Sequence, residues 1–195
     1  MPRFPQVIAV SGSHRDNANT EAMLLACVSE LKKQKISVEL IVLRNLSFEP
    51  TDACAICDDD NPPHFKDELQ WLLPKIISAD GWIIATPEYW WGVSGHCKQF
   101  LDRLTPYWRK REKYFWGKKT AIITCGGQPL ERTGYAEAHL ELFFEKMKMP
   151  LIGKVRASAE APEEILQQPG VLNECRKLGK KMAEELRKKP KIKIK

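Results

Sequence analysis

The sequence has no uncharged apolar run that approaches the roughly 20 residues a membrane-spanning helix needs. Its first apolar run, residues 7–10, is also too short for the hydrophobic region of a secretory signal peptide. We therefore expect a cytoplasmic protein without a membrane partner. The 195 residues, 43% of them hydrophobic and 29% charged, suit one globular domain, which we place at residues 1–189.

Most of the chain has no excess of positive or negative charge. The net charge of +6 arises at the C-terminal end, because the last nine residues hold six of the 31 lysines and arginines and no acid. The other 25 basic residues are matched by 25 acidic ones. We interpret residues 190–195 as a solvated basic tail. Since no nucleic-acid-binding motif accompanies it, a nucleic-acid partner is the less favoured interpretation.

Two common nucleotide-binding motifs are also absent. The stretch at residues 7–20, VIAVSGSHRDNANT, contains neither GxxxxGK[ST] nor GxGxxG, which excludes a nucleoside-triphosphate P-loop and the dinucleotide fingerprint. What is present is an apolar run, then a hydroxyl-rich loop, then a helical pattern. A strand, loop and helix N-terminus in this order present free backbone N–H groups and the positive end of a helix dipole to an anion.

We interpret this loop as a site for a terminal phosphate. Ser11, Ser13 and Arg15 supply hydroxyl groups and one positive charge, and Asn19 and Thr20 stand where the helical pattern begins. The alternative is a simple helix N-cap made by Asn19 or Thr20. A cap alone does not require the other three residues, so we favour the phosphate.

Apolar strands alternate with amphipathic helices along the chain. Pro74 predicts a kink or break in one helix, Pro169-Gly170 an interruption of another, and residues 107–116 an irregular segment. The pattern predicts an α/β fold with a doubly wound, five-stranded parallel sheet covered by helices on both faces. The expected strands are residues 7–11, 37–43, 82–86, 119–124 and 151–155, and the expected helices are residues 20–34, 64–79, 96–104, 135–147 and 163–189.

Three polar or Gly/Pro-rich loops follow the first, third and fourth predicted strands. Ligands of such sheets bind beyond the carboxyl ends of the strands, where these loops converge. The second loop carries Tyr89, Trp90 and Trp91, which could cover a flat heteroaromatic ring or pack in a dimer interface. The third, Cys125-Gly126-Gly127, offers unobstructed backbone N–H groups for the polar edge of a flavin, or is only a tight turn.

These motifs resemble those of the NADPH-dependent FMN reductase family within the flavodoxin-like flavoproteins. The resemblance rests on Gly12-Ser13-His14-Arg15 with Asn19-Thr20, Ala79-Asp80, Thr86-Pro87-Glu88-Tyr89, Val93-Ser94-Gly95, Lys98 and residues 100–103. It implies the flavodoxin-like strand order 2-1-3-4-5 and a noncovalently bound FMN. The cofactor-binding residues that it implies are Ser11, Ser13, His14, Arg15, Asn19 and Thr20 at the phosphate, and Pro87, Glu88, Tyr89, Trp90, Gly92, Cys125, Gly126 and Gly127 at the isoalloxazine.

The resemblance implies an NAD(P)H oxidoreductase that works by a ping-pong mechanism. A nicotinamide reduces the FMN, and a quinone, nitro or azo aromatic, flavin, ferric chelate or protein then accepts the electrons. The flavin supplies the chemistry, so no catalytic acid or base of the protein is expected. Lys98, Asp102 and Arg103 are interpreted as structural or dimer contacts, and family habit suggests a homodimer or homotetramer.

Two other functions stay open. A flavodoxin-like electron carrier would need no NAD(P)H activity, although such carriers are usually acidic and the body of this chain is neutral. A flavin-free interaction protein would use the aromatic loop and the basic tail. Anaerobic reduction by NAD(P)H separates the first alternative from a reductase, and a failure to take up FMN would support the second.

The six cysteines give little evidence of a metal site. Only Cys54 and Cys57 lie close together, in a long irregular segment that resembles the cysteine-rich loop of the iron–sulfur branch of the family. Two thiolates cannot provide a four-cysteine cage, and His64 would bring a zinc site to only three ligands. We rank a relic or structural pair first, a redox-active thiol pair second and a metal site third.

Overall fold

The computed structural model describes residues 5–51 and 65–188. Cys54, Cys57, His64 and the tail at residues 190–195 lie outside the described residues, so the predictions made for them are not tested. No helix among those described is both long enough and apolar enough to cross a membrane.

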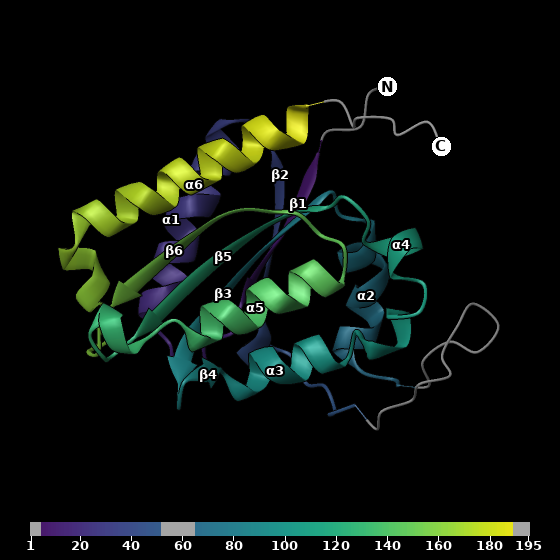
Figure 1. Cartoon of the computed structure of the whole chain (residues 1–195), viewed down its shortest axis with the longest axis horizontal. Helices are drawn as coiled ribbons and strands as arrows, with labels where there is room; N and C mark the ends of the chain where they lie inside the picture. The colour runs from purple at the N-terminus through teal and green to yellow at the C-terminus, as the bar shows by residue number, and fades with distance from the viewer. Residues whose placement is uncertain (1–4, 52–64, 189–195) are drawn as a thin grey trace.

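Five parallel strands form the centre of the molecule (Figure 1). Their order in the sheet is β2-β1-β3-β5-β6, which is the predicted order 2-1-3-4-5 when the parallel strands are counted along the chain. The predicted α/β, flavodoxin-like fold is therefore confirmed. These strands are β1 (Gln6–Ser11), β2 (Ser37–Val42), β3 (Gly81–Tyr89), β5 (Lys119–Gly126) and β6 (Leu151–Ser158).

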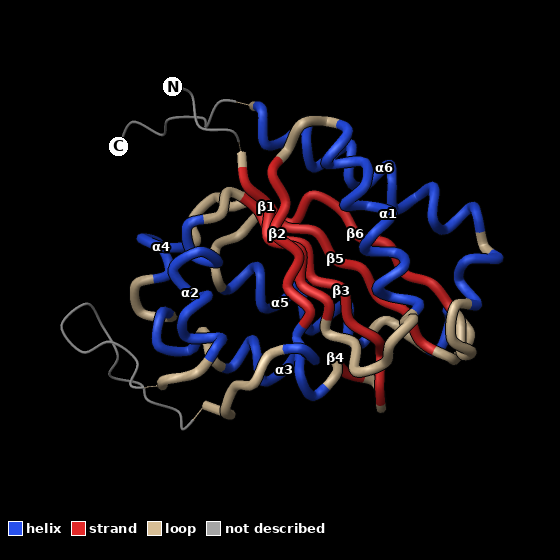
Figure 2. Tube along the Cα trace, turned by 180° about the vertical axis from the view of Figure 1, so that it is seen from behind, coloured by secondary structure: helices blue, strands red, loops and turns tan. Residues whose placement is uncertain are grey.

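Helices cover both faces of the sheet, as Figure 2 shows. One face carries α1 (Asn19–Lys33) and α6 (Pro169–Arg187). The other carries α2 (Glu68–Ser78), α3 (Gly95–Asp102), α4 (Arg111–Tyr114) and α5 (Tyr135–Lys146). Short 3-10 turns lie at Leu43–Asn45, Thr105–Tyr107, Leu130–Arg132 and Glu164–Gln167.

The strands are apolar throughout because both of their faces are buried. In β1, Val7 and Ala9 pack under α1 and α6, whereas Ile8 and Val10 pack under the helices of the opposite face. All four side chains are fully buried. This two-sided burial explains why the strands read as continuous apolar runs rather than as an alternation of apolar and polar residues.

Several local features differ from the sequence-based expectation. β3 continues past Thr86 to Tyr89 and pairs with a short antiparallel strand, β4 (Gly92–Val93), which was not predicted. The segment expected to be irregular contains the one-turn helix α4. Pro74 does not end α2, which runs on to Ser78. The interruption predicted at Pro169 is confirmed, because α6 begins there after the 3-10 turn.

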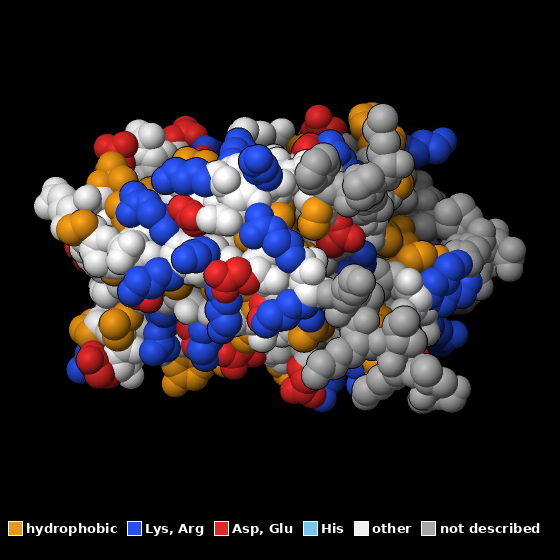
Figure 3. Space-filling model, turned by 90° about the horizontal axis from the view of Figure 1, so that it is seen from above, with side chains coloured by type: hydrophobic (Ala, Val, Ile, Leu, Met, Phe, Trp, Pro, Cys, Tyr) orange, Lys and Arg blue, Asp and Glu red, His pale blue; other side chains and the backbone are white. Residues whose placement is uncertain are grey.

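Charge is unevenly distributed even though the body of the chain is neutral. Figure 3 shows Lys and Arg side chains gathered over the face that α6 presents, with a few acidic side chains between them. This face lies on the outer side of a helix whose inner side packs on the sheet through Leu178 and Met182.

A buried arginine joins the C-terminal end of α3 to the N-terminal end of α2. Arg103, only 1% exposed, donates from Nη1 to Asp67 Oδ2 at 2.5 Å and to the carbonyl of Glu49 at 2.9 Å, and its guanidinium lies 3.7 Å from the ring centroid of Phe65. Asp67 is also the N-cap of α2, accepting from Gln70 N. Arg103 thus has a structural role, as expected for it.

This pair predicts an acid-sensitive fold. Burial raises the pKa of Asp67, but the hydrogen bonds from Arg103, Gln70 N and Glu49 N outweigh burial and hold that pKa below its usual value. A lowered pKa means that the stabilisation is present above the unfolded-state pKa of about 4 and is lost as the pH falls through the folded-state pKa.

The variant Asp67→Asn tests this, because it keeps an N-cap for α2 but removes the group that titrates. Urea unfolding from about pH 6 to pH 2 should therefore show a flatter acid limb for this variant, and a limb as steep as the unmodified protein's would contradict the assignment. Asp102→Asn, at a more exposed acid, is the control.

Candidate functional site

A cavity of about 210 Å³ lies where the carboxyl ends of the parallel strands meet. It collects residues from the loop after β1, the end of β3, the end of β5 and the loop after β6. Convergence at this edge of a doubly wound sheet was predicted from the positions of the loops. The residues that line it are Ser13, Arg15, Ala18, Asn19, Thr20, Pro87, Glu88, Tyr89, Cys125, Gly126, Gly127, Ala159, Glu160 and Pro162.

The N-terminus of α1 opens into this cavity without a side-chain cap. The N-cap residue is Ala18, which has no side-chain acceptor for the N–H groups of the first turn. Thr20 Oγ1 is buried and has no hydrogen-bond partner among the described residues, and the residue as a whole is only 2% exposed. Asn19 instead ties the helix to the segment after β6, donating to Ala161 O at 2.8 Å and accepting from Ile165 N at 3.1 Å. The simple N-cap by Asn19 or Thr20 is therefore not what the structure contains.

Two residues of the first loop add donors and charge at the same place. Ser13 is buried and accepts a hydrogen bond from Arg15 N at 3.1 Å. The Arg15 side chain is exposed and donates from Nη1 to the carbonyl of Glu160 at 3.1 Å. Free helix N–H groups, a buried unpartnered hydroxyl and a guanidinium are the kinds of donor that can bind an anion such as a phosphate.

Ser11 lies outside the cavity. It shares a face of β1 with Val7 and Ala9, because side chains alternate along a strand, and that face lies under α1. Its hydroxyl donates to Glu21 Oε2 at 3.2 Å. The structure thus gives Ser11 a contact within the fold and not a place on the cavity wall.

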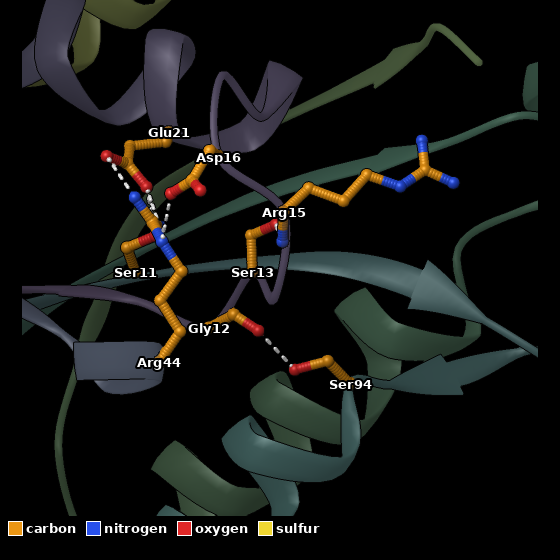
Figure 4. A network of polar contacts seen from close by, with 8 residues as sticks. All are labelled: Ser11, Gly12, Ser13, Arg15, Asp16, Glu21, Arg44 and Ser94. Atoms are coloured by element: carbon orange, nitrogen blue, oxygen red, sulfur yellow. Dashed lines mark hydrogen bonds and ion pairs between the residues drawn. The ribbon is translucent and has the colours of Figure 1, made fainter. Parts of the chain in front are cut away.

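Ser11 belongs to a network that neutralises the acids beside the anion site (Figure 4). Arg44 pairs with Glu21 at 2.5 Å and with Asp16 at 2.9 Å. The hydrogen bond to Glu21 is the main cause of the raised pKa of Arg44. Figure 4 shows Arg15 reaching away from this network on the other side of the loop. Because Arg44 pairs with the carboxylates of Glu21 and Asp16, these two acids do not pair with Arg15. The sequence did not reveal this role of Arg44.

His14 also lies outside the cavity. It is exposed, and its ring stacks on that of His96 with the centroids 3.7 Å apart and the planes inclined by 21°. Burial, together with the nearby His14, lowers the pKa of His96. His14 therefore joins the first loop to α3, as does Ser94, whose Oγ donates to Gly12 O at 2.5 Å.

The end of β3 reaches the cavity through Pro87, Glu88 and Tyr89. The Glu88 carboxylate is committed to α5, since Oε2 accepts from Gly134 N at 2.9 Å and from Ala136 N at 3.0 Å. Glu88 therefore fixes the position of the β3 end relative to α5.

Trp90 and Gly92, both predicted site residues, belong to the hairpin beyond β3. Trp90 and Trp91 form its two-residue turn, and Gly92 pairs with Tyr89. With Gln128, Arg132 and Thr133, the two tryptophans line a second cavity of about 240 Å³. This cavity also shares Glu88, Gly126 and Gly127 with the first.

The third predicted loop lies on the cavity wall as expected. A Cβ at Gly126 would lie 3.2 Å from Thr133 Cγ2, and one at Gly127 would lie 3.4 Å from the Glu160 side chain, so side chains here would crowd the wall. Burial raises the pKa of the Cys125 thiol to about 11, and its Sγ lies 3.7 Å from Ala159 O. The thiol is therefore protonated near pH 7, and a protonated thiol is not a nucleophile.

Four lining residues were missed from the sequence: Ala18, Ala159, Glu160 and Pro162. The last three follow β6, which was expected to end at residue 155 but continues to Ser158 beside Gly126. A signal was available, because the fifth strand of a parallel sheet must also end at this edge. Its polar final residues concealed how far the strand extends.

Comparison with known proteins identifies the family of the chain. The family model described as NADPH-dependent FMN reductase matches residues 5–163. An iron–sulfur flavoprotein of Methanocaldococcus jannaschii is 28% identical over 190 residues, which cover 92% of this chain and 96% of that protein. An NAD(P)H-dependent FMN reductase of Saccharomyces cerevisiae is 25% identical over 154 residues, which cover 74% and 75% of the two chains.

Solved structures support the fold. An NADH:FMN oxidoreductase in its apo form matches with a TM-score of 0.70 at 18% identity, covering 96% of this chain and 92% of that one. At this identity the likeness concerns the fold alone, and the assignment rests on the family model, which covers most of the chain. The chain belongs to the NADPH-dependent FMN reductase family.

Proposed function

We propose that the first cavity holds the FMN of an NAD(P)H oxidoreductase, with its phosphate at the N-terminus of α1. The observation that carries this proposal is the uncapped helix start, where the buried Thr20 Oγ1 has no partner among the described residues. A fold that leaves such a group unsatisfied loses about 1–3 kcal/mol, and a phosphate oxygen would recover it.

The residues of the chain would bind and orient the cofactor without taking part in proton transfer. Ser13, Thr20 and Arg15 would hold the phosphate, and the N–H groups of Gly126 and Gly127 would face the polar edge of the ring. When bound, FMN supplies the redox chemistry between a nicotinamide and an acceptor. Ser11 and His14 are not part of this proposal, because both have partners outside the cavity.

The acceptor in this proposal is a small molecule such as a quinone, a nitro or azo aromatic, a flavin or a ferric chelate. The second cavity is open and adjoins the first, which supports an acceptor that approaches the FMN from there. We also propose a homodimer or homotetramer, supported by exposed aromatic side chains such as Trp71 at 70% and Trp116 at 59%.

The visible spectrum of the purified protein tests this function. With FMN added, an absorbance band shifted from that of free flavin should appear, and anaerobic NADH or NADPH should bleach it rapidly. Binding without rapid bleaching would instead support a flavodoxin-like carrier. Protein that takes up no FMN would contradict both flavin functions.

Removing the Arg15 guanidinium should weaken FMN binding about tenfold. We expect the lower end of the range for a charged hydrogen bond, because the Arg15 side chain is exposed and water screens its charge. Fluorescence titration of FMN into Arg15→Ala measures the change. Arg176→Ala, at an exposed arginine of α6, is the matched control. An Arg15→Ala variant that binds FMN as tightly as the control would argue against the phosphate position.

A further inference from the structure

The turn between β3 and β4 holds two tryptophans in a backbone conformation that bulky residues rarely adopt. Trp90 has φ of 49° and Trp91 has φ of 55°. A two-residue hairpin turn with both φ values positive normally carries Asn-Gly, which adopts them without strain. Strain of this kind persists where the surrounding structure and the function require it.

Both tryptophans are also exposed to solvent. Trp90 is 92% exposed and Trp91 is 55% exposed, with the ring centroids 6.0 Å apart. Since neither ring is packed into the core, the strain does not serve the stability of the fold. The rings instead form one wall of the second cavity, a position from which they can contact a flat ligand.

The lining of the same cavity includes a positive charge. Arg132 is exposed, and its guanidinium has no hydrogen-bond or ion-pair partner among the described residues. A second guanidinium lies beside the cavity, because Arg156 Nη1 donates to Thr133 O at 2.8 Å.

The carboxylate on the wall of the second cavity makes its hydrogen bonds elsewhere. Glu88 is the acidic residue of the cavity wall, and its Oε2 accepts from Gly134 N and Ala136 N at the start of α5. Glu160 lines the first cavity and lies against Gly127 there. The second cavity thus combines aromatic walls with a cation that no described residue pairs.

We propose that the second cavity binds a planar aromatic acceptor that carries a carboxylate or sulfonate group. The tryptophans contact the ring, and Arg132 binds the anion. This inference rests on the proposed function, which places FMN in the adjoining first cavity. It adds the substrate class, which the resemblance to the family leaves open.

Two near-isosteric probes test the proposal. Oxidised, FMN-loaded protein is titrated calorimetrically with 4-nitrobenzoate and with 4-nitrobenzamide, which differ in the charge of one group. The unmodified protein should bind the carboxylate about tenfold more tightly than the amide, as expected for a partly exposed guanidinium–carboxylate contact. Arg132→Gln should lose this preference, while Arg176→Gln, the matched control for net charge, should keep it.

Further variants separate the wall from the anion site. Trp91→Leu should weaken both probes equally, because it removes ring contact and leaves the guanidinium in place. Equal binding of the two probes by the unmodified protein would overturn the proposal, as would a preference that survives in Arg132→Gln. The proposal would also be overturned if Arg132→Gln lowered the affinity for NADPH and left the affinity for both probes unchanged. Arg132 would then bind the electron donor and not the acceptor.

The proposed function can fail independently of this inference. If the protein takes up no FMN, the same titrations are made on the cofactor-free protein, where a carboxylate preference that depends on Arg132 still supports the site. If FMN binds and NAD(P)H reduces it but the probes are not distinguished, the proposed function stands and the substrate class is wrong.

Discussion

Replacing Ala18 by Asp is expected to weaken FMN binding about a hundredfold or more while it stabilises the cofactor-free protein. Ala18 is the N-cap of α1, with an extended backbone at φ −73° and ψ 139°, and it lines the first cavity. An Asp carboxylate here would accept hydrogen bonds from the free N–H groups of the first helical turn. It would therefore occupy the positive helix end that the proposed function assigns to the phosphate.

The substitution should raise the stability of the cofactor-free protein and lower its affinity for FMN, and the two changes are measured separately. An Asp N-cap at a helix N-terminus contributes about 1 kcal/mol to stability. Phosphate binding loses charged hydrogen bonds of about 1.5–3 kcal/mol each and gains like-charge repulsion, which amounts to a loss of affinity of about a hundredfold or more. Thermal unfolding without FMN measures the first effect, and FMN fluorescence titration measures the second.

Ala18→Ser separates the cap from the charge. Its hydroxyl can also cap the helix but brings no negative charge, so we expect a gain in stability of similar sign and a loss of FMN affinity of about tenfold or less. If Ala18→Asp bound FMN as the unmodified protein does, the phosphate would have to lie elsewhere. If both variants lost affinity equally, space rather than charge would limit the site.

Much of the fold was predictable because burial on both faces leaves a clear signal. Continuous apolar runs such as the one containing Ile83 and Ile84 mark the parallel strands, and those two residues are fully buried. The order of the strands followed from the resemblance to the flavodoxin-like family. The β3–β4 hairpin was not predictable, because two tryptophans occupy turn positions where turn chemistry predicts Asn-Gly.

The site was predictable at the level of its loops and less so at the level of its side chains. Thr20 and Gly127 lie on the cavity wall because helix starts and glycine turns point to the same edge of the sheet. Ser11 is the last residue of β1, and the alternation of side chains along that strand already places it on the face under α1. His14 lies in the loop, and it points away from the cavity because its partner, His96, is set by tertiary packing. In an irregular loop, no periodicity indicates which side chains face inward.

Replacing Gly179 by Ala is expected to destabilise the protein by about 2–3 kcal/mol, at the upper end of what overpacking costs. Gly179 is buried in α6 where that helix packs on α1, and a Cβ there would lie 2.5 Å from the carbonyl oxygen of Cys27. The obstacle is helix backbone, which cannot rotate away as a side chain can. The preference of a helix for Ala over Gly, about 1 kcal/mol, offsets only part of the clash.

The same helix supplies a matched control with the opposite sign. Gly170 lies in the first turn of α6, and a Cβ there would meet nothing within 4 Å, so Gly170→Ala should stabilise the protein by about 0.5 kcal/mol. Urea unfolding of both variants measures the difference. Equal stabilities would mean that α6 can move away from α1 at little cost.

The clash at Gly179 should also reach the proposed phosphate site. The start of α1 is tied to the segment before α6 by the two hydrogen bonds of Asn19, to Ala161 O and from Ile165 N. If α6 shifts away from Cys27, this connection must stretch or carry the shift to the helix start that bears Thr20. Gly179→Ala should therefore weaken FMN binding as well as stability, whereas Gly170→Ala should leave FMN affinity unchanged. A destabilised Gly179→Ala variant with full FMN affinity would show that the helix start holds its position independently of the packing between α1 and α6.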